Sequence, residues 1–238
     1  MSIPKIIHYC WFGGGAISPE NRKCMESWKK YCPDYKIMAW NEQNFDISTN
    51  RYAQQAYEAK KYAFVSDYVR LAVLYEYGGI YLDTDVELVR PLDELLELPG
   101  FMGFQTNNEV ATGLGFGARK GNSVVQALLR DYDALDFLKA DGSADLTPCP
   151  ERNTRVLQAL GVRKDGTRQS IAEMEIFPAE YFCPMDLYSR ELRVTPKTYS
   201  IHRYAESWKP KPSAVSRILQ RLLKKHYYTW YCPLQYHV

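Results

Sequence analysis

The stretch from Tyr62 to Glu87 constrains the fold most strongly, because a helical pattern, a double glycine and a short apolar run follow one another without a gap. Its first part carries apolar residues at helical spacing: Phe64, Tyr68, Leu71 and Tyr75. Gly78-Gly79 supplies a C-terminal stop, so we predict a helix that ends at about Tyr77. The apolar run at 80–82 then predicts a short buried strand.

Two carboxylates follow that strand. Asp83 and Asp85 lie two residues apart, so both can converge on one hard cation while Thr84 points away. A cation held in this way can neutralise a diphosphate. In open α/β sheets the carboxyl ends of the strands are where ligands bind. The pair therefore predicts a ligand site at this edge of the sheet.

Asp67 and Arg70 lie three residues apart on the predicted helix and share one face. Together they offer an acceptor and a forked donor that suit a hydroxyl-rich or anionic ligand. The alternative is an ordinary exposed ion pair, which contributes little to stability. Spacing alone leaves both interpretations open.

The elements Ser66-Asp67-Tyr68-Val69-Arg70 and Gly78-Gly79-Ile80-Tyr81-Leu82-Asp83-Thr84-Asp85 closely resemble the signature of glycosyltransferase family 32, the capsular-polysaccharide and initiating-mannosyltransferase type. They also resemble the core of the clostridial glucosylating toxins. The resemblance implies that Asp67 and Arg70 hold the donor sugar and act in catalysis. It implies that Asp83 and Asp85 serve the nucleotide diphosphate and a divalent metal, and that Tyr81 contacts the donor. It also implies the GT-A fold of nucleotide-sugar-dependent transferases.

The N-terminal part predicts a Rossmann-type half sheet. A β-rich run at 5–12 opens into Gly13-Gly-Gly15, where a ligand can approach the backbone closely. A helix capped by Ser18, a second strand at 35–40 and a helical region at 52–77 follow, which favours an α/β domain with a mixed central sheet.

Two residues of the first strand are candidates for the site. Trp11 is either a core residue or, as the resemblance implies, the residue that stacks on the base of the donor. His8 is the weaker candidate, because a histidine in a strand is more often a structural residue with satisfied hydrogen bonds.

Three later segments complete the domain. The run 112–118 alternates glycine with apolar residues, which indicates close approach of a ligand or of another segment. Asn122 is predicted to cap a helix that extends to about Leu138. The loop-rich region 147–198 matches the family poorly, so we expect acceptor specificity to lie there.

His202 begins a second informative motif, His202-x-x-x-x-Ser207-Trp208. It resembles the late element of the family, in which a C-terminal loop covers the donor, so Ser207 and Trp208 are predicted to bind the nucleotide sugar. The resemblance also favours His202 as a third metal ligand beside Asp83 and Asp85 rather than a surface histidine. One nitrogen among oxygen ligands favours Mn²⁺ over Mg²⁺.

The C-terminal tail is basic and amphipathic. From Arg203 onward there are seven basic and one acidic side chains, a net charge of +6, so the rest of the chain carries −4 to give the total of +2. Segment 213–231 combines a basic amphipathic helix with aromatic residues, which favours contact with an anionic membrane or packing on the domain. We divide the chain into a GT-A-like domain, 1–208, and a helical extension, 209–238. No nucleic-acid-binding motif accompanies the basic residues.

Two absences shape the expected location. No signal-peptide pattern and no run of about 18 apolar residues is present, so we expect a cytoplasmic protein, peripheral on the membrane at most. The cysteines are scattered, with no C-x-x-C pair, and free thiols are expected: Cys10, Cys24, Cys32, Cys149, Cys183 and Cys232.

Together these features predict a metal-dependent glycosyltransferase, and the resemblance implies that it retains the anomeric configuration. It would move a hexose from a UDP-sugar to a polysaccharide or a lipid-linked glycan. One alternative is a phosphohydrolase of the haloacid dehalogenase type, which also places Asp-x-Asp after a strand. The motif of that class has Thr or Val two residues after the second Asp, where this chain has Glu87. The other is an inactive module that binds a sugar nucleotide or a membrane.

Overall fold

The structure is a computed structural model that describes residues 2–186 and 189–205. The predicted extension at 209–238, the domain boundary at 208, and Ser207, Trp208 and Cys232 all lie outside the described residues and stay predictions. The other cysteines are free, as expected, and all five are buried. Among the described helices none is long and apolar enough to cross a membrane.

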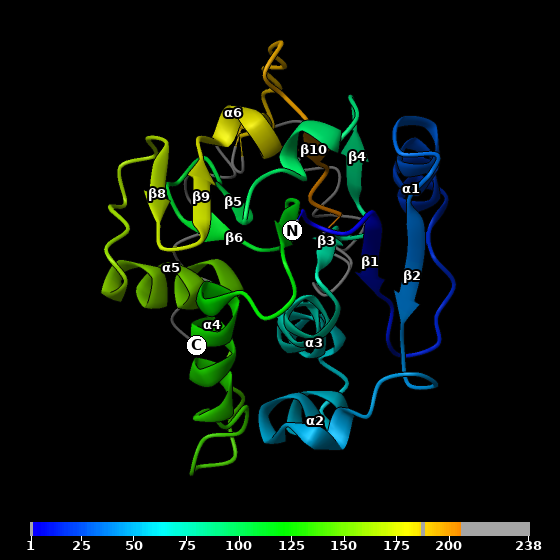
Figure 1. The fold of residues 1–238 in the computed structure, drawn as a ribbon. Helices are drawn as coiled ribbons and strands as arrows, with labels where there is room; N and C mark the ends of the chain where they lie inside the picture. Colours follow the sequence, from blue (N-terminus) through cyan, green and yellow to red (C-terminus); the bar gives the residue numbers. More distant parts are fainter. Residues whose placement is uncertain (1, 187–188, 206–238) are drawn as a thin grey trace.

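Within the described part of the chain, one mixed sheet has the order β2-β1-β3-β7-β5-β9-β8, with β6 paired to β5, and a small second sheet joins β10 to β4 (Figure 1). The strands of the large sheet are β1 (Ile6–Cys10), β2 (Lys36–Trp40), β3 (Gly79–Tyr81), β5 (Gly100–Phe104), β6 (Val110–Ala111), β7 (Phe116–Ala118), β8 (Gln169–Ile171) and β9 (Met174–Phe177). Those of the small sheet are β4 (Val86–Leu88) and β10 (Ser200–His202). The first three strands are parallel, which is the predicted Rossmann-type half sheet. The expected α/β fold class with a mixed central sheet is confirmed.

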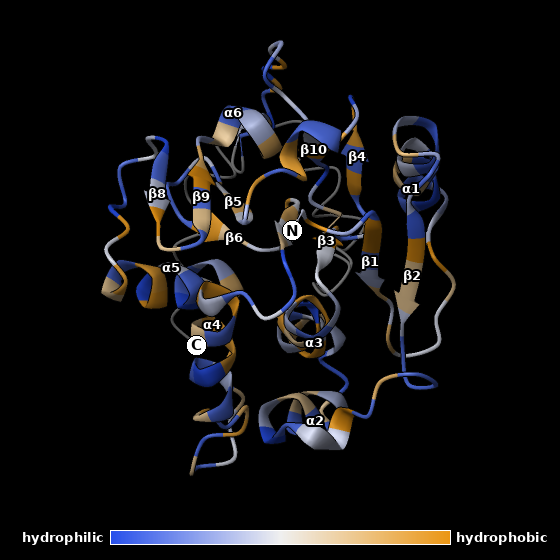
Figure 2. Cartoon of the chain, in the orientation of Figure 1, coloured by the Kyte–Doolittle hydropathy of each residue, from blue (hydrophilic) through white to orange (hydrophobic). Residues whose placement is uncertain are grey.

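Helices cover both faces of the large sheet (Figure 1). On one side lie α2 (Arg51–Glu58), α3 (Tyr62–Tyr77), α4 (Ser123–Asp133) and α5 (Cys149–Ala159), and on the other α1 (Pro19–Tyr31) and the short α6 (Ala179–Phe182). Because side chains alternate along a strand, neighbouring residues enter different cores: Ile80 packs in one cluster and Tyr81 in the other. Figure 2 shows the apolar residues gathered on the strands and on α3.

Two predicted helices differ from those observed. The helical region at 52–77 is broken, because Lys60 adopts a positive φ of 58° between α2 and α3. The helix after Asn122 ends at Asp133, not near Leu138. Asn122 caps it as predicted, accepting hydrogen bonds from the Val124 and Val125 amides, and Ser18 caps α1 by accepting one from the Asn21 amide.

His8 is a structural residue in the parallel half of the sheet. Its Nδ1 accepts a hydrogen bond from the Trp40 indole at 3.0 Å, so Nε2 carries the proton and donates to the Gly78 carbonyl at 2.8 Å. Burial lowers the pKa of His8 to about 4, and the ring is neutral at neutral pH. The imidazole thus ties β1 to β2 and to the Gly78-Gly79 turn before β3.

Replacing His8 by leucine should lower the free energy of unfolding by about 2 kcal/mol, because an indole N–H and a carbonyl would be buried without partners. Urea unfolding at neutral pH measures this loss. Nucleotide affinity should not change at a temperature where the variant is folded. Unchanged stability with weakened nucleotide binding would instead make His8 a site residue.

Candidate functional site

Asp83 and Asp85 lie in the turn that joins β3 to β4, at the carboxyl end of a central strand. The turn is fixed by backbone hydrogen bonds: the Asp83 amide donates to the Gly113 carbonyl, and the Val86 amide donates to the Asp83 carbonyl. Thr84 points away, as predicted, and accepts a hydrogen bond from Asn21 of α1 at 2.9 Å. Both carboxylates are therefore presented on one side of the turn.

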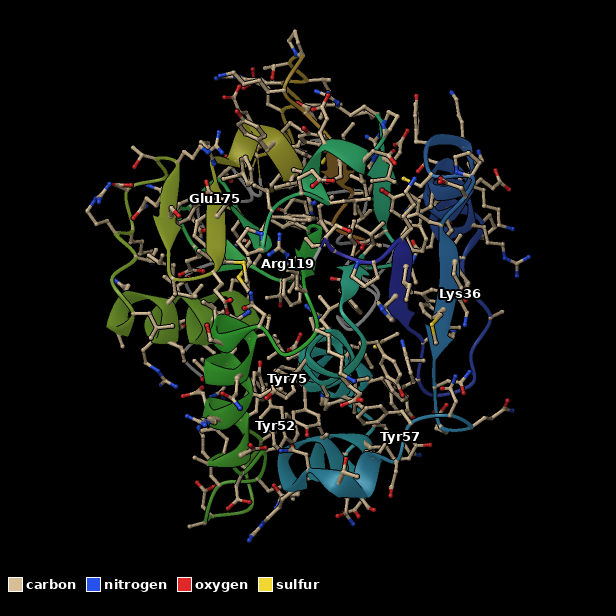
Figure 3. All side chains as sticks on the ribbon, viewed as in Figure 1. Lys36, Tyr52, Tyr57, Tyr75, Arg119 and Glu175 are labelled. Carbon is tan, nitrogen blue, oxygen red and sulfur yellow. The ribbon has the colours of Figure 1, made fainter. Side chains whose placement is uncertain are left out.

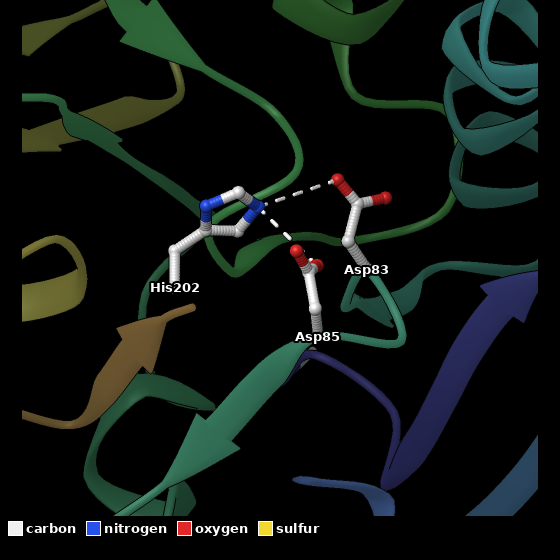
Figure 4. A group of neighbouring side chains, drawn as sticks. All are labelled: Asp83, Asp85 and His202. Carbon is white, nitrogen blue, oxygen red and sulfur yellow. Dashed lines mark ion pairs between the residues drawn. The ribbon is translucent and has the colours of Figure 1, made fainter. Parts of the chain in front are cut away.

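His202 reaches the same place from the far end of the chain (Figure 4). It lies at the end of β10, which pairs with β4 so that His202 is opposite Val86. Its Nε2 is 3.4 Å from Asp85 Oδ1 and 3.9 Å from Asp83 Oδ2. One ligand atom from each of the three residues lies within 4.8 Å of the others. The predicted metal set Asp83, Asp85 and His202 is thus brought together.

Asp83 and His202 shift each other's pKa. Burial alone would lower the pKa of His202, but the carboxylates of Asp85 and Asp83 outweigh burial and raise it. Burial would raise the pKa of Asp83, yet Arg70 and His202 lower it below its usual value. Two carboxylate oxygens and one imidazole nitrogen suit a borderline divalent cation such as Mn²⁺. The chemistry of the residues therefore fits a metal, although the ligand role itself stays a prediction.

Asp67 and Arg70 form a buried ion pair and not an exposed one. Arg70 Nη2 lies 3.1 Å from Asp67 Oδ1, and the side chains are 7 % and 12 % exposed. The same nitrogen lies 3.2 Å from Asp83 Oδ1, so one guanidinium joins the helix α3 to the metal set. The surface interpretation of this pair is wrong, because α5 and the segment before β7 cover it.

The charges of this pair respond to burial in opposite ways. Burial raises the pKa of Asp67 to about 6, although Arg70 works against the shift. For Arg70, burial would lower the pKa, but Asp83, Tyr81 and Asp67 raise it well above its usual value. Arg70 is therefore a fixed cation between two carboxylates, and Asp67 changes its charge near pH 6.

Tyr81 lies beneath the pair and is fully buried, with 1 % of its surface exposed. Its ring centre is 4.9 Å from the Arg70 guanidinium carbon, and its hydroxyl donates to Asp83 Oδ1 at 2.9 Å. The structure therefore gives the phenol a supporting contact with Asp83. A direct contact with the donor stays a prediction.

Trp11 is half-buried at the end of β1, whereas the next residue, Phe12, packs in the core. Its indole donates to the Gly15 carbonyl within the glycine-rich turn. The interpretation of Trp11 as a fully buried core residue is wrong, and its predicted stacking on the base stays a prediction.

Four further residues line the inner end of the site and were not predicted individually: Thr112, Gly113, Cys149 and Asn153. Thr112 Oγ1 lies 3.4 Å from Arg70 Nη1 and accepts from Asn153 at 3.1 Å. Cys149 Sγ lies 3.7 Å from Arg70 Nη1. The glycine alternation at 112–118 was the only signal in the sequence. It has two causes, since Gly113 adjoins Asp83 whereas Gly117 packs on Phe101.

Comparisons with known proteins point to the same family as the sequence motifs. Residues 18–101 match the family described as the glycosyltransferase sugar-binding region containing the DXD motif. The match includes Asp67, Arg70, Asp83 and Asp85, and it confirms the resemblance seen in the sequence. Over residues 18–101 the chain is therefore similar to glycosyltransferases with a DXD motif.

The individual relatives share less than a third of their aligned residues with this chain. Inositol phosphoceramide mannosyltransferase 3 of Schizosaccharomyces pombe is 29% identical over 151 residues, 57% of this chain and 39% of that protein. An uncharacterised glycosyltransferase, L373, of Acanthamoeba polyphaga mimivirus is 25% identical over 221 residues, 87% of this chain and 84% of that protein. The solved PaToxG glycosyltransferase is 21% identical, with a TM-score of 0.49 over 66% of this chain and 69% of that one. This chain thus spans about two fifths of the length of the fungal relative.

Proposed function

We propose that the protein is a metal-dependent glycosyltransferase that moves a hexose from a nucleoside diphosphate sugar, most simply a UDP-sugar, to a hydroxyl of a polysaccharide or lipid-linked glycan. The observation that carries the proposal is the convergence of Asp83, Asp85 and His202 beside the buried pair of Asp67 and Arg70. A cation site and a fixed guanidinium are what a diphosphate leaving group requires.

Each group has a place in the proposed reaction. Asp83, Asp85 and His202 would hold Mn²⁺ or Mg²⁺, which supplies positive charge to the diphosphate when bound. Arg70 stabilises the charge that develops on the leaving phosphate, and Asp67 accepts hydrogen bonds from hydroxyls of the donor sugar. Trp11, Ser207 and Trp208 are proposed to hold the nucleotide.

The resemblance implies retention of anomeric configuration, and we propose a front-face substitution. The bond from the anomeric carbon to the acceptor oxygen forms as its bond to the phosphate oxygen breaks. The proton of the acceptor passes to the leaving phosphate. Isolation of a covalent glycosyl-enzyme would contradict this mechanism.

The acceptor proposal draws on one relative. The name of the fungal relative describes an enzyme that adds mannose to an inositol phosphoceramide. A lipid-linked acceptor would suit the basic segment 213–231, and we propose that the protein works at the cytoplasmic face of a membrane.

A donor screen tests the function directly. Purified protein is incubated with UDP-glucose, UDP-galactose, UDP-N-acetylglucosamine or GDP-mannose, with Mn²⁺ or EDTA, and release of the nucleotide is measured. The proposal expects Mn²⁺-dependent release from one donor that Asp85→Ala abolishes. Hydrolysis of a simple phosphoester without release from any donor would favour a phosphohydrolase, and binding of a donor without turnover would favour an inactive module.

Affinity for the sugar part of the donor should fall as the pH is lowered through about 6. Burial raises the pKa of Asp67 to about 6, so its carboxylate is charged above that pH and neutral below it. A neutral Asp67 loses its ion pair with Arg70 and one acceptor for a sugar hydroxyl.

The ratio of UDP-hexose affinity to UDP affinity measures this effect, because titration of His202 and the metal site affects both ligands. The ratio should fall about tenfold per unit below pH 6 in the wild type and stay flat in Asp67→Asn. A flat ratio in the wild type would remove Asp67 from the sugar site.

A further inference from the structure

The two-residue segment Thr112-Gly113 runs directly past the Arg70–Asp83 ion pair. It lies between β6 and β7, far in sequence from both partners, and Thr112 is fully buried. The Gly113 carbonyl accepts the backbone N–H of Asp83 at 3.1 Å. This hydrogen bond therefore fixes the position of the turn that carries the two carboxylates.

Gly113 leaves room for the Asp83 carboxylate. A Cβ at this position would lie 2.9 Å from Asp83 Cγ, closer still to Asp83 Oδ2, and 3.3 Å from Arg70 Nη1. Its φ is not among the positive values of the described glycines, so alanine can adopt this backbone conformation. Space for the carboxylate, and not backbone freedom, thus requires glycine at this position.

Thr112 secures the other partner of the pair. Its hydroxyl lies 3.4 Å from Arg70 Nη1, and it is held in turn by Asn153 Nδ2 at 3.1 Å and Cys149 Sγ at 3.3 Å. Asn153 and Cys149 lie one turn apart on α5, and both are buried. Through Thr112, α5 thus helps to hold the Arg70 guanidinium in place, although no residue of α5 was predicted as a ligand.

We propose that Thr112 and Gly113 are positioning residues of the donor site. Gly113 keeps the Asp83 carboxylate turned toward Asp85 and His202, and Thr112 fixes the guanidinium of Arg70, with α5 holding the threonine in place. This inference rests on the proposed function, because it assigns the cation to Asp83 and the donor to Arg70. It places the start of the region expected to recognise the acceptor, 147–198, in the donor site instead.

Two sets of variants test the proposal. In Gly113→Ala the affinity for Mn²⁺ alone, measured by electron paramagnetic resonance of the free ion, should fall 10–100-fold, as when the groups that orient a metal ligand are removed. The thermal unfolding midpoint in EDTA should fall less than in Gly117→Ala, because the 26 % exposed Asp83 side chain can turn toward solvent whereas Phe101 is fully buried. Gly117→Ala is the matched control. Its Cβ would lie 2.8 Å from Phe101 Cζ in the core, so it should lower the midpoint and leave Mn²⁺ affinity unchanged.

Thr112→Val removes the hydroxyl at nearly constant volume, and Thr112→Ser keeps it. The valine variant should weaken binding of UDP-glucose, or of whichever donor the screen identifies, about tenfold and leave affinity for Mn²⁺ alone unchanged. The serine variant should restore the wild-type affinity. If Gly113→Ala does not fold, the two Thr112 variants still test the positioning role.

Failure of the proposed function and failure of the positioning role give different results. A wild type that binds neither Mn²⁺ nor a nucleotide overturns the proposed function itself. A wild type that binds both, with Gly113→Ala and Thr112→Val binding as tightly as the wild type, overturns only the positioning role. Equal losses in the valine and serine variants would also overturn it, because the hydroxyl would then not be the group that matters.

Discussion

Replacing Arg70 by alanine is expected to slow transfer strongly and to lower the free energy of unfolding by about 3 kcal/mol, because it leaves Asp67 buried without its cation and removes the nearer cationic partner of Asp83. The side chains of Asp67 and Asp83 are 12 % and 26 % exposed, and both lie within about 3 Å of one guanidinium nitrogen. No other cation in the described part of the chain is paired with Asp67. Turnover should fall at least 100-fold, because the leaving diphosphate loses its fixed positive charge.

Urea unfolding and initial rates on the identified donor measure the two effects. Arg155→Ala is the control, because Arg155 pairs with Asp131 at the surface and is 62 % exposed. That pair should contribute less than about 1 kcal/mol, and activity should be unchanged. Arg70→Lys keeps a charge but not the fork, so it should recover stability more than activity. Full activity in Arg70→Lys would show that the paired geometry is not needed.

Replacing Asp83 by asparagine should lower Mn²⁺ affinity by at least about 100-fold, beyond the effect expected of groups that only support a ligand. Asparagine keeps the shape and can still accept from Tyr81, so the turn is retained while one negative ligand charge is lost. The remaining set, Asp85 and His202, has a single anionic ligand for a divalent cation.

Paramagnetic titration with Mn²⁺ in the absence of nucleotide measures this loss. Asp131→Asn provides the control, since it removes a carboxylate of the same charge that pairs with Arg155 and not with any predicted ligand, and it should leave Mn²⁺ affinity as it is. If Asp83→Asn bound Mn²⁺ like the wild type, Asp83 would serve only as the partner of Arg70 and would not be a metal ligand.

Local patterns sufficed to predict the centre of this site. The helical spacing before Gly78-Gly79 and the apolar run after it define α3 and β3, and these elements place Asp83 and Asp85 at a strand end regardless of the rest of the chain. The position of His202 required the resemblance, because its neighbourhood depends on the pairing of β10 with β4 across more than a hundred residues.

Local patterns could not predict which residues line the inner end of the site. Whether Asp67 and Arg70 are buried depends on α5 and on the segment at 112–113, which meet them only in the folded chain. In the same way, the break between α2 and α3 rests on the positive φ of Lys60, a residue type that gives no signal for it. Spacing predicts which residues share a face, but not what covers that face.

The most direct test of the central claim is calorimetric titration of the wild type and of Asp85→Ala with UDP and with GDP, each with Mn²⁺ and with EDTA. The account predicts that UDP binds the wild type only with Mn²⁺, that GDP binds more weakly, and that Asp85→Ala binds neither. Tight Mn²⁺-dependent binding of GDP alone would keep the site and change the donor class. Absence of binding by both nucleotides, or binding that ignores both Mn²⁺ and Asp85, would contradict the claim that Asp83, Asp85 and His202 form the metal centre of a nucleotide-sugar transferase.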